Sequence, residues 1–265
     1  MILNTLAEHF RFDKTSVANL KNHPDFLMKH VHSFYEIIFF VSGDANYVVE
    51  GKRYRLKKND LIFTRPLTYH YIEILSNATY TRYLIAFTPN KDEEKTLLQS
   101  IPQHLDVVNF HEQSIVNDDF KRFDYYATRL EGEALKDVYL GLIKEILHNL
   151  ALTETDVITI PSEISPILTR ALEYINENLF TISGVEELAN RLALSQPYLF
   201  KIFKQQLKIS PKQYINLKRL QHAQKMIQRG KRPNEIYFDC GFDSYVGFYK
   251  QYVKTFGYPP SKEKP

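Results

Sequence analysis

The sequence is poor in the features that mark secreted, membrane-spanning or common catalytic proteins. It has a single cysteine, Cys240, so no disulfide can form within the chain. No stretch approaches the ~20 consecutive apolar residues that a membrane-spanning helix needs. The N-terminal segment MILNTLAEHFRFDK has acidic and polar residues where an export signal would need an apolar segment. We therefore expect a cytoplasmic protein without a membrane partner.

Signatures of several enzyme classes are also missing. The sequence has no Ser-His-Asp order, no phosphate-binding loop and no glycine-rich dinucleotide turn. We therefore expect a protein that is not an enzyme and that needs no cofactor.

Charge is divided unevenly along the chain, although the net charge of +3 is small. Residues 166–265 hold 16 basic and 8 acidic side chains, whereas residues 1–165 hold 18 basic and 23 acidic ones. A basic half joined to an acidic half indicates a polyanion partner, such as nucleic acid, for the C-terminal half. The length of 265 residues suggests two domains, because a domain typically has roughly 100–200 residues.

The N-terminal half has the pattern of short β-strands. Four segments between residues 30 and 90 are rich in Ile, Val, Phe, Tyr and Thr: EIIFFVSG, NYVVEG, KRYRLKKNDLIFT and TRYLIAFTP. Gly43-Asp44 and Glu50-Gly51 have the composition of hairpin turns. Many short strands with tight turns predict a sandwich or a small β-barrel.

A helical period begins near residue 118. It is carried by Leu135, Val138, Tyr139, Leu142, Ile146 and Leu150. This apolar face predicts either a dimer surface or packing on the chain's own barrel. Pro161 and Pro166 then interrupt the pattern and indicate a linker. The predicted divisions are 1–117 for a sensing domain, 118–155 for a helical dimerisation or packing segment, 156–165 for a linker and 166–265 for a helical domain.

Residues 184–207 predict a helix-turn-helix. Val185, Leu188 and Leu192 give one apolar face, and Leu199 and Phe203 belong to a second. The break at Leu194-Ser195 separates them, with Ser195 as a helix N-cap and Pro197 in the first turn of the second helix.

The same pattern returns in residues 234–256. Ile236 and Cys240 are predicted to face inward, Gly241-Phe242 makes the turn, and Phe248 and Tyr252 form the core side of the next helix. A single helix that includes residues 214–227 connects the two units. Such a connector would fix the two reading helices relative to each other, so that they enter successive major grooves on one DNA face.

These residues carry a resemblance to a family, the AraC/XylS-type transcription regulators. It covers residues ~166–261 and rests on LANRLALS with YLFKIFK, on Tyr214 with Arg219-Leu220 and Ala223, and on Gly241-Phe242 with Phe248, Tyr252, Gly257 and Pro260. Lys208 replaces the glycine that usually ends the first reading helix. A left-handed lysine there would cost about 1 kcal/mol relative to glycine.

The resemblance implies which residues touch double-stranded DNA. From the first reading helix, Pro197, Phe200 and Lys201 would face bases, and Gln196 and Lys204 would lie at the phosphate edge. From the second, Tyr245, Val246, Tyr249 and Lys250 would face bases. Lysine can donate to guanine, whereas Phe and Val can contact only thymine methyl groups.

The N-terminal half resembles a cupin, a small jelly roll that often serves this family as effector sensor. His30, His32, Glu36 and Gly43 match the first cupin signature, and Asn59-Asp60, Pro66 and His70 match part of the second. The implied fold class is α+β with two domains: a cupin-like barrel followed by two helix-turn-helix units joined by a helix.

Two kinds of ligand fit the polar residues of this half. His30, His32, Glu36 and His70 form a set that suits Fe(II), Mn(II), Zn(II) or Ni(II). The same groups, with Arg65 and Arg82, could instead hydrogen-bond an organic effector, and Tyr47, Tyr54, Tyr69 and Tyr71 could pack on the faces of a sugar. We expect the organic effector without metal, because the second signature is incomplete.

Together these patterns predict an effector-responsive, DNA-binding transcription regulator, with a sugar or glycoside as the effector. The resemblance also implies a homodimer and, if the protein is an activator, contact with RNA polymerase. Two alternatives stay open. One is a metal-dependent cupin enzyme with an accessory helical domain, and the other is an effector-independent regulator whose barrel is only a scaffold.

Overall fold

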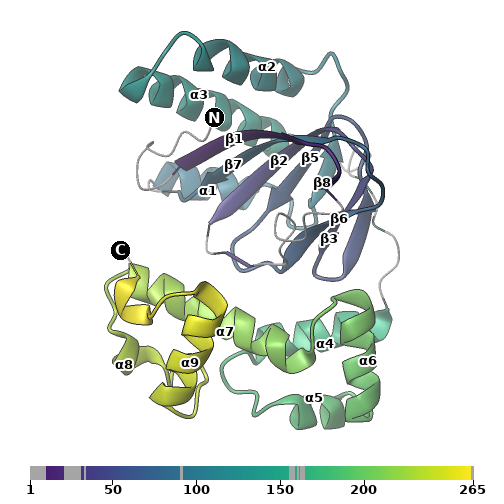
Figure 1. Ribbon diagram of the computed structural model, residues 1–265, viewed down its shortest axis with the longest axis vertical. Helices are drawn as coiled ribbons and strands as arrows, with labels where there is room; N and C mark the ends of the chain where they lie inside the picture. The colour runs from purple at the N-terminus through teal and green to yellow at the C-terminus, as the bar shows by residue number, and fades with distance from the viewer. Residues whose placement is uncertain are drawn as a thin grey trace.

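The computed structural model describes residues 10–20, 31–32, 34–89, 92–154, 159, 161 and 165–263. It confirms the predicted α+β class with two halves (Figure 1), a sheet-containing N-terminal half and a helical C-terminal half. The strands are β1 (Phe10–Val17), β2 (Tyr35–Ser42), β3 (Ala45–Val49), β4 (Lys52–Arg55), β5 (Asp60–Thr64), β6 (His70–Ile74), β7 (Tyr80–Phe87) and β8 (Val107–Asn109).

The helices fall into two groups, one in each half. The N-terminal half contains α1 (Asp92–Ser100), α2 (Ile115–Ala127) and α3 (Gly132–Ala151). The C-terminal half contains α4 (Pro166–Glu177), α5 (Val185–Arg191), α6 (Gln196–Gln206), α7 (Pro211–Gln228), α8 (Pro233–Ile236), α9 (Tyr245–Phe256) and a final 3-10 turn, η4 (Pro260–Lys262). Within the described parts of the chain, none of these helices has the length and apolarity to cross a membrane.

The described strands form two antiparallel sheets, not a closed barrel. The five-stranded sheet has the order β1-β7-β2-β5-β8, and the three-stranded sheet has the order β4-β3-β6. Residues from both sheets pack into one apolar cluster, which includes Phe40, Tyr47, Ile62 and Ile72. The N-terminal half is therefore a sandwich of two sheets around a common interior.

The two predicted hairpin turns have different outcomes. Glu50 and Gly51 join β3 to β4 as a two-residue turn with φ of 44° and 82°, and Val49 pairs with Lys52, so this hairpin is confirmed. The hairpin predicted at Gly43-Asp44 is wrong, because β2 pairs with β5 and β7 while β3 belongs to the other sheet. The turn at Gly43 carries the chain from one sheet to the other.

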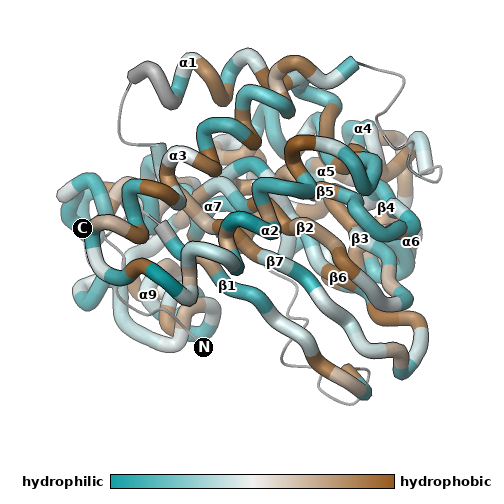
Figure 2. Tube along the Cα trace, turned by 90° about the horizontal axis from the view of Figure 1, so that it is seen from above, coloured by the Kyte–Doolittle hydropathy of each residue, from teal (hydrophilic) through white to brown (hydrophobic). Residues whose placement is uncertain are grey.

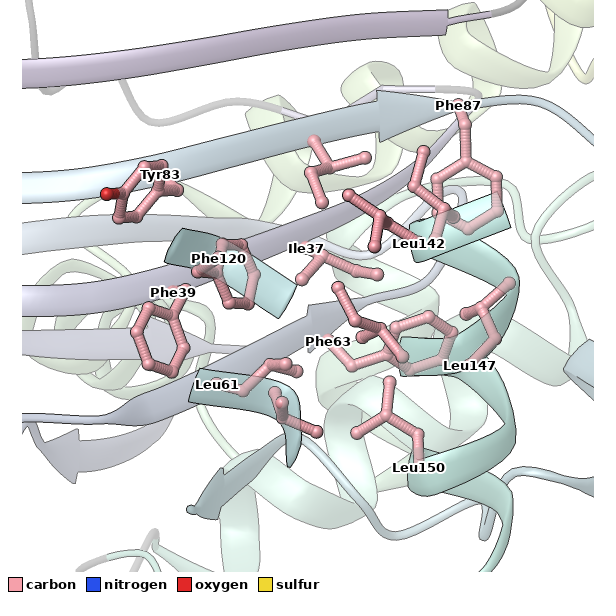
Figure 3. Close-up of a cluster of buried hydrophobic side chains, with 14 of the residues drawn as sticks. Ile37, Phe39, Leu61, Phe63, Tyr83, Phe87, Phe120, Leu142, Leu147 and Leu150 are labelled. Carbon is pink, nitrogen blue, oxygen red and sulfur yellow. The ribbon is translucent and has the colours of Figure 1, made fainter. Parts of the chain in front are cut away.

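Alternation along the strands sorts side chains between two layers. On β2, Ile37 and Phe39 face the helices, whereas Ile38 and Phe40 face the interior. Figure 3 shows the helix-facing residues of the large sheet packed against Leu142 and other residues of α3. This packing stabilises α3, since burying one large apolar side chain contributes roughly 1.5–3 kcal/mol.

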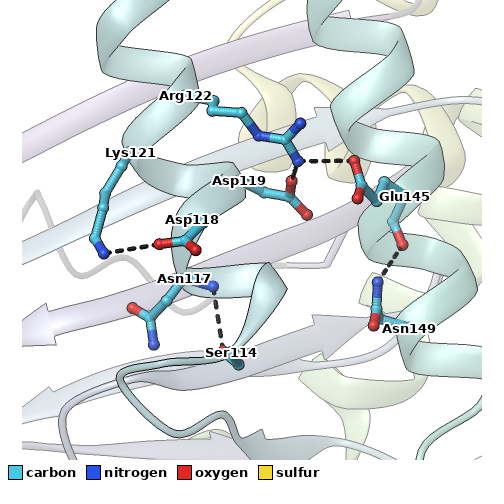
Figure 4. Close-up of polar contacts among 8 residues, drawn as sticks. All are labelled: Ser114, Asn117, Asp118, Asp119, Lys121, Arg122, Glu145 and Asn149. Carbon is cyan, nitrogen blue, oxygen red and sulfur yellow. Dashed lines mark hydrogen bonds and ion pairs between the residues drawn. The ribbon is translucent and has the colours of Figure 1, made fainter.

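Polar contacts hold α2 and α3 together outside this core. The Arg122 guanidinium contacts Asp119 on its own helix and reaches Glu145 of α3 at 2.8 Å (Figure 4). The Ser114 hydroxyl caps α2 by accepting from the backbone of Asn117. Of the two roles predicted for the apolar face of α3, packing on the chain's own sheet is the one observed, and the homodimer stays a prediction.

The helices of the C-terminal half alternate hydrophobic and hydrophilic positions along the trace (Figure 2), as expected for helices that bury one face. Most of the predicted linker 156–165 lies outside the described residues. Within it, the Thr159 backbone donates to the Val107 carbonyl of β8 at 2.9 Å. The linker is therefore attached to the large sheet at that point.

Candidate nucleic-acid interface and sensor site

The first predicted helix-turn-helix is formed by α5 and α6. Ala193 turns the chain with a φ of 56°, and the Ser195 hydroxyl accepts from the Tyr198 backbone at 3.3 Å to cap α6. Pro197 lies in the first turn, where its missing donor costs nothing. Phe203 is fully buried on the inner face of α6, so the opposite face of the helix is left in solvent.

The second unit is formed by α8 and α9. Gly241 makes its turn with a φ of 81°, and the Ser244 hydroxyl accepts from Gly247 at 3.2 Å to cap α9. Phe248 and Tyr252 are fully buried on the inner side of α9, as predicted. Both units therefore have a short first helix, a tight turn and a longer second helix with one exposed face.

The residues predicted to read DNA lie on these exposed faces. Large apolar side chains remain in solvent there, with Phe200 47%, Val246 62% and Tyr249 40% exposed. Tyr245 differs, because it is half-buried against Tyr237, with ring centroids 5.9 Å apart. The other predicted positions are all exposed: Gln196, Pro197, Lys201, Lys204 and Lys250.

Arg219 of α7 joins the two units. Its guanidinium donates to the carbonyls of Leu179 and Ile182 beside the first unit, at 2.8 and 2.6 Å, and to Gly241 in the turn of the second, at 2.7 Å. Burial lowers the pKa of Arg219 from its usual value. A side chain at Gly241 would lie 2.7 Å from the Arg219 Nε. Glycine is therefore required for this close approach as well as for the turn.

Lys212 is a candidate DNA contact that the sequence reasoning missed. It is exposed near the start of α7 and lines a groove between the two units together with Gln196 of α6 and Gln251 of α9. Ser210 caps α7 and Pro211 is its first residue, so Lys212 lies in the first turn of α7, beside this groove. The Ser-Pro pair in the sequence was the available signal.

Lys208 has the conformation considered from the sequence. Its φ is 63°, directly after Leu207 ends α6. The cost of about 1 kcal/mol for a left-handed lysine therefore applies.

In the N-terminal half, the structure brings together three of the four residues of the predicted metal set. His32 precedes β2, Glu36 lies on β2 and His70 begins β6. All three are buried, and their candidate ligand atoms lie within 4.8 Å of one another. The two His Nε2 atoms are 3.8 Å (His32) and 3.5 Å (His70) from Glu36 carboxylate oxygens. His30 lies outside the described residues.

Backbone carbonyls orient both imidazole rings of this cluster. The Nδ1 of His32 lies 2.9 Å from the Phe34 carbonyl, and the Nδ1 of His70 lies 2.8 Å from the Thr68 carbonyl. A proton on each Nδ1 would donate to that carbonyl and leave Nε2 directed at Glu36. Burial alone would raise the pKa of Glu36, but hydrogen bonding and charge from His70, with charge from His32 and Arg82, lower it to about 2.

The other predicted effector residues are not all in this cluster. Arg82 lies on the interior face of β7, close enough for its charge to act on Glu36. Arg65 instead donates to the carbonyls of Leu105 and Pro102, at 3.0 and 2.7 Å, so its guanidinium holds the loop before β8. It does not reach the cluster, because it follows Thr64 and alternation turns it away from the interior.

The four tyrosines considered as sugar contacts also separate. Tyr47 and Tyr54 are buried in the interior between the two sheets. Tyr71 of β6 and Tyr69, directly before this strand, belong to a cluster with helices of the C-terminal half. The prediction of a common tyrosine-lined site is therefore wrong for Tyr69 and Tyr71.

Comparisons with known proteins match both halves of the chain. A family model described as an AraC-like ligand binding domain matches residues 20–146, and a helix-turn-helix domain model matches residues 188–264. The activator RhaS of Escherichia fergusonii is 26% identical over 241 residues, which cover 88% of this chain and 85% of RhaS. The uncharacterized regulator YbfI of Bacillus subtilis is 22% identical over 217 residues, covering 80% and 78%.

Among solved structures, ToxT from Vibrio cholerae aligns with 96% of this chain and 97% of its own, at 13% identity and a TM-score of 0.40. The two family models, the two helix-turn-helix units and the preceding sheet domain agree with one another. The chain belongs to the AraC family of DNA-binding transcription regulators that carry an AraC-like ligand-binding domain.

Proposed function

We propose that this regulator reads DNA with α6 and α9 and responds to a small organic effector held at the His32–Glu36–His70 cluster. The observation that carries the proposal is the burial of this cluster inside the ligand-binding half, where a charged carboxylate faces two histidines. The three side chains converge on one point from separate segments of the chain. A ligand with several hydroxyl groups supplies both donors and acceptors for them.

A sugar or glycoside is the effector class that we propose. Glu36 accepts hydrogen bonds, and the two imidazoles can donate or accept according to their protonation. Tyr47 and Tyr54 add buried aromatic faces on the neighbouring strands of the small sheet. This combination of apolar surface with a few converging polar groups is typical of small-molecule sites.

Replacing His32 with alanine is expected to abolish the effector response and to leave DNA binding without effector unchanged. The reason is that His32 is buried in the cluster, whereas the predicted reading residues of α6 and α9 are on exposed faces. Calorimetry with a panel of monosaccharides and glycosides would identify a ligand for the native protein, and anisotropy with labelled DNA would give the response.

The matched control is His104→Ala, an exposed histidine outside the cluster. A normal response in the His32 variant would remove the cluster from the site. No binding by any sugar at millimolar concentration would contradict the proposed effector class.

A divalent metal ion is a second candidate for the same cluster. Two imidazole nitrogens and a carboxylate with ligand atoms within 4.8 Å of one another form a donor set that suits Zn(II), Fe(II), Mn(II) or Ni(II). The carbonyls that hold both Nδ1 atoms resemble the outer partners that orient metal-ligating histidines. If bound, the metal would be held by His32, Glu36 and His70.

We expect metal binding at this cluster to depend on His70. Equilibrium dialysis with each ion, followed by elemental analysis, should find about one equivalent on the native protein. His70→Ala should lose it, and His104→Ala should keep it. No metal on the native protein would exclude this candidate, and metal retained by the His70 variant would move it elsewhere.

Two other functions, a cupin enzyme and an effector-independent regulator, have less support than the effector-responsive regulator. Catalytic turnover after Fe(II) or Mn(II) loading would support a cupin enzyme, and an absence of any small-molecule effect on DNA affinity would support a scaffold barrel. We also propose a homodimer, measurable by sedimentation at micromolar concentration, and contact with RNA polymerase if the protein activates transcription.

A further inference from the structure

The small sheet separates the sensor interior from the DNA-binding half, with one face toward each. On β6, His70 and Ile72 face the interior and Tyr71 faces the opposite way, as does Tyr69 directly before the strand. These two tyrosines pack in one cluster with helices of the C-terminal half, as does Val48 of β3. Consecutive residues of one strand therefore touch the candidate effector site and the DNA-binding half.

Side chains on the outer face of the small sheet bind the C-terminal end of α6, the first reading helix. The Tyr69 hydroxyl donates to the Leu207 carbonyl at 2.9 Å, and the Tyr71 hydroxyl donates to the Gln206 carbonyl at 3.4 Å. The last carbonyls of a helix have no partner within the helix, so these hydroxyls replace water there. The Tyr69 side chain is only 1% exposed, so its hydrogen bond is shielded from solvent.

The turn between β3 and β4 holds the connector helix. Glu50 accepts from the Tyr69 backbone at 2.9 Å, from the Lys218 ammonium at 2.7 Å and from the Tyr214 hydroxyl. Lys218 and Tyr214 are buried residues of α7. Removing one partner of a buried ion pair strongly destabilises a protein. The folded state therefore favours arrangements in which Glu50 and Lys218 stay in contact. We call Glu50, Tyr69, Tyr71, Tyr214 and Lys218 the interdomain latch.

The second histidine-bearing segment also touches α7. The Leu67 backbone donates to the His32 carbonyl at 2.8 Å, and Lys218 donates to the Leu67 carbonyl. Gln221 of α7 donates to the carbonyl of Val31, next to His32. His32 is thus linked to α7 through backbone carbonyls, and His70 is linked to the end of α6 through the side chains of its neighbours Tyr69 and Tyr71.

The interdomain latch contacts the first reading unit but does not cover the face of α6 that is predicted to read DNA. Phe200 and Lys201 of α6 are exposed, although the end of the same helix is held by Tyr69. Among the described residues, the buried cluster of the second unit has members from α7 onward and none from the sheets. The sensor half therefore restrains the position of the first unit without covering its DNA-reading surface.

We propose that β6 transmits the state of the His32–Glu36–His70 cluster to the first helix-turn-helix through the interdomain latch. The proposal rests on the proposed function, because it assigns the route by which an effector at that cluster changes DNA binding. A ligand that moves His70 moves Tyr69 and Tyr71 with it, since they are its two neighbours in the chain, directly before and within β6. The response then requires two arrangements of the latch that differ in ligand affinity.

Hydrogen exchange of the full-length chain tests this route without knowledge of the effector. Tyr69→Phe removes one hydroxyl and keeps the ring, so exchange in residues 203–218 should accelerate about fivefold, as expected for the loss of one hydrogen bond. Glu50→Gln should accelerate the same segment. His70→Gln should also accelerate it, although His70 faces the interior.

Matched controls separate transmission from general loss of stability. Tyr83→Phe removes a buried tyrosine's hydrogen bond to Asp124 on the far side of the large sheet, and His104→Gln changes an exposed histidine. Neither should alter exchange in residues 203–218. Exchange in α9, residues 245–256, should stay unchanged in every variant.

Three outcomes would overturn the inference. The latch is excluded if Tyr69→Phe and Glu50→Gln leave residues 203–218 unchanged, and transmission is excluded if His70→Gln does. Equal acceleration of α9 would indicate general destabilisation. If the expected exchange pattern is found in a protein that binds no sugar and no metal, the coupling stands and the proposed function alone fails.

Discussion

Replacing Arg219 with lysine is expected to loosen the two reading units from each other. Arginine satisfies three carbonyls from two units at distances of 2.6–2.8 Å, and lysine cannot reproduce this planar fork. A lysine that keeps one contact leaves two carbonyls of a buried region without a donor. At about 1.5–3 kcal/mol for each hydrogen bond to a charged group, we expect the two lost bonds to lower the free energy of unfolding by roughly 3–6 kcal/mol.

The same substitution should also weaken DNA binding. Two reading helices on a rigid connector bind as one unit, whereas loosened units lose the advantage of high effective concentration. We expect at least a tenfold loss of affinity for a two-part site and a smaller dependence on salt, because fewer phosphates are contacted at once.

Urea unfolding and fluorescence anisotropy at several salt concentrations measure both effects of the Arg219 substitution. Arg229→Lys is the matched control, since Arg229 is exposed at the end of the same helix. An unchanged unfolding midpoint together with unchanged DNA affinity would show that Arg219 does not join the units.

Lys201→Ala and Lys204→Ala are expected to differ in kind. Lys201 lies on the exposed face of α6 predicted to meet bases, so its loss should cost ~1–3 kcal/mol at the preferred site and relax preference at one or two base pairs. Lys204 is predicted at the phosphate edge, and its ammonium lies 5.7 Å from the Phe200 ring centroid. Its loss should weaken all sequences alike and lower the salt slope by about one.

Selection of DNA sites by the full-length protein, followed by binding to the selected site and its single-base variants, separates these two roles. Lys121→Ala on α2 is the control, because this exposed lysine pairs with Asp118 far from the reading helices. Equal effects of Lys201→Ala and Lys204→Ala on every sequence would overturn the assignment of roles.

The helical half was well predicted because its signals are local. Apolar residues at helical spacing, the Ser195 cap and the Gly241 turn each act within a few residues, and both units form where they were expected. The exposed reading residues follow from the same period. Tyr245 is the partial exception, since its contact with Tyr237 depends on how α8 and α9 pack.

The sheet half was predicted less completely, because strand pairing is long-range. The segment KRYRLKKNDLIFT divides into β4 and β5, which belong to different sheets. The two strands are separated by a turn in which the Asp60 carboxylate accepts from the Lys57 backbone. β1, β6 and β8 were not among the predicted strand segments, and the hairpin at Gly43 is absent because β2 and β3 separate. Periodicity identifies a strand but not its neighbour.

By itself, the sequence determined the two-domain class, both helix-turn-helix units and the candidate ligands His32, Glu36 and His70. Tertiary structure alone decided that Arg65 turns away from these ligands and that Lys212 lies between the two reading helices. It also decided that Tyr69 and Tyr71 contact the reading domain. The physical reason is that local spacing sets the period and face of each element, whereas the partner of each face depends on how segments far apart in the chain pack together.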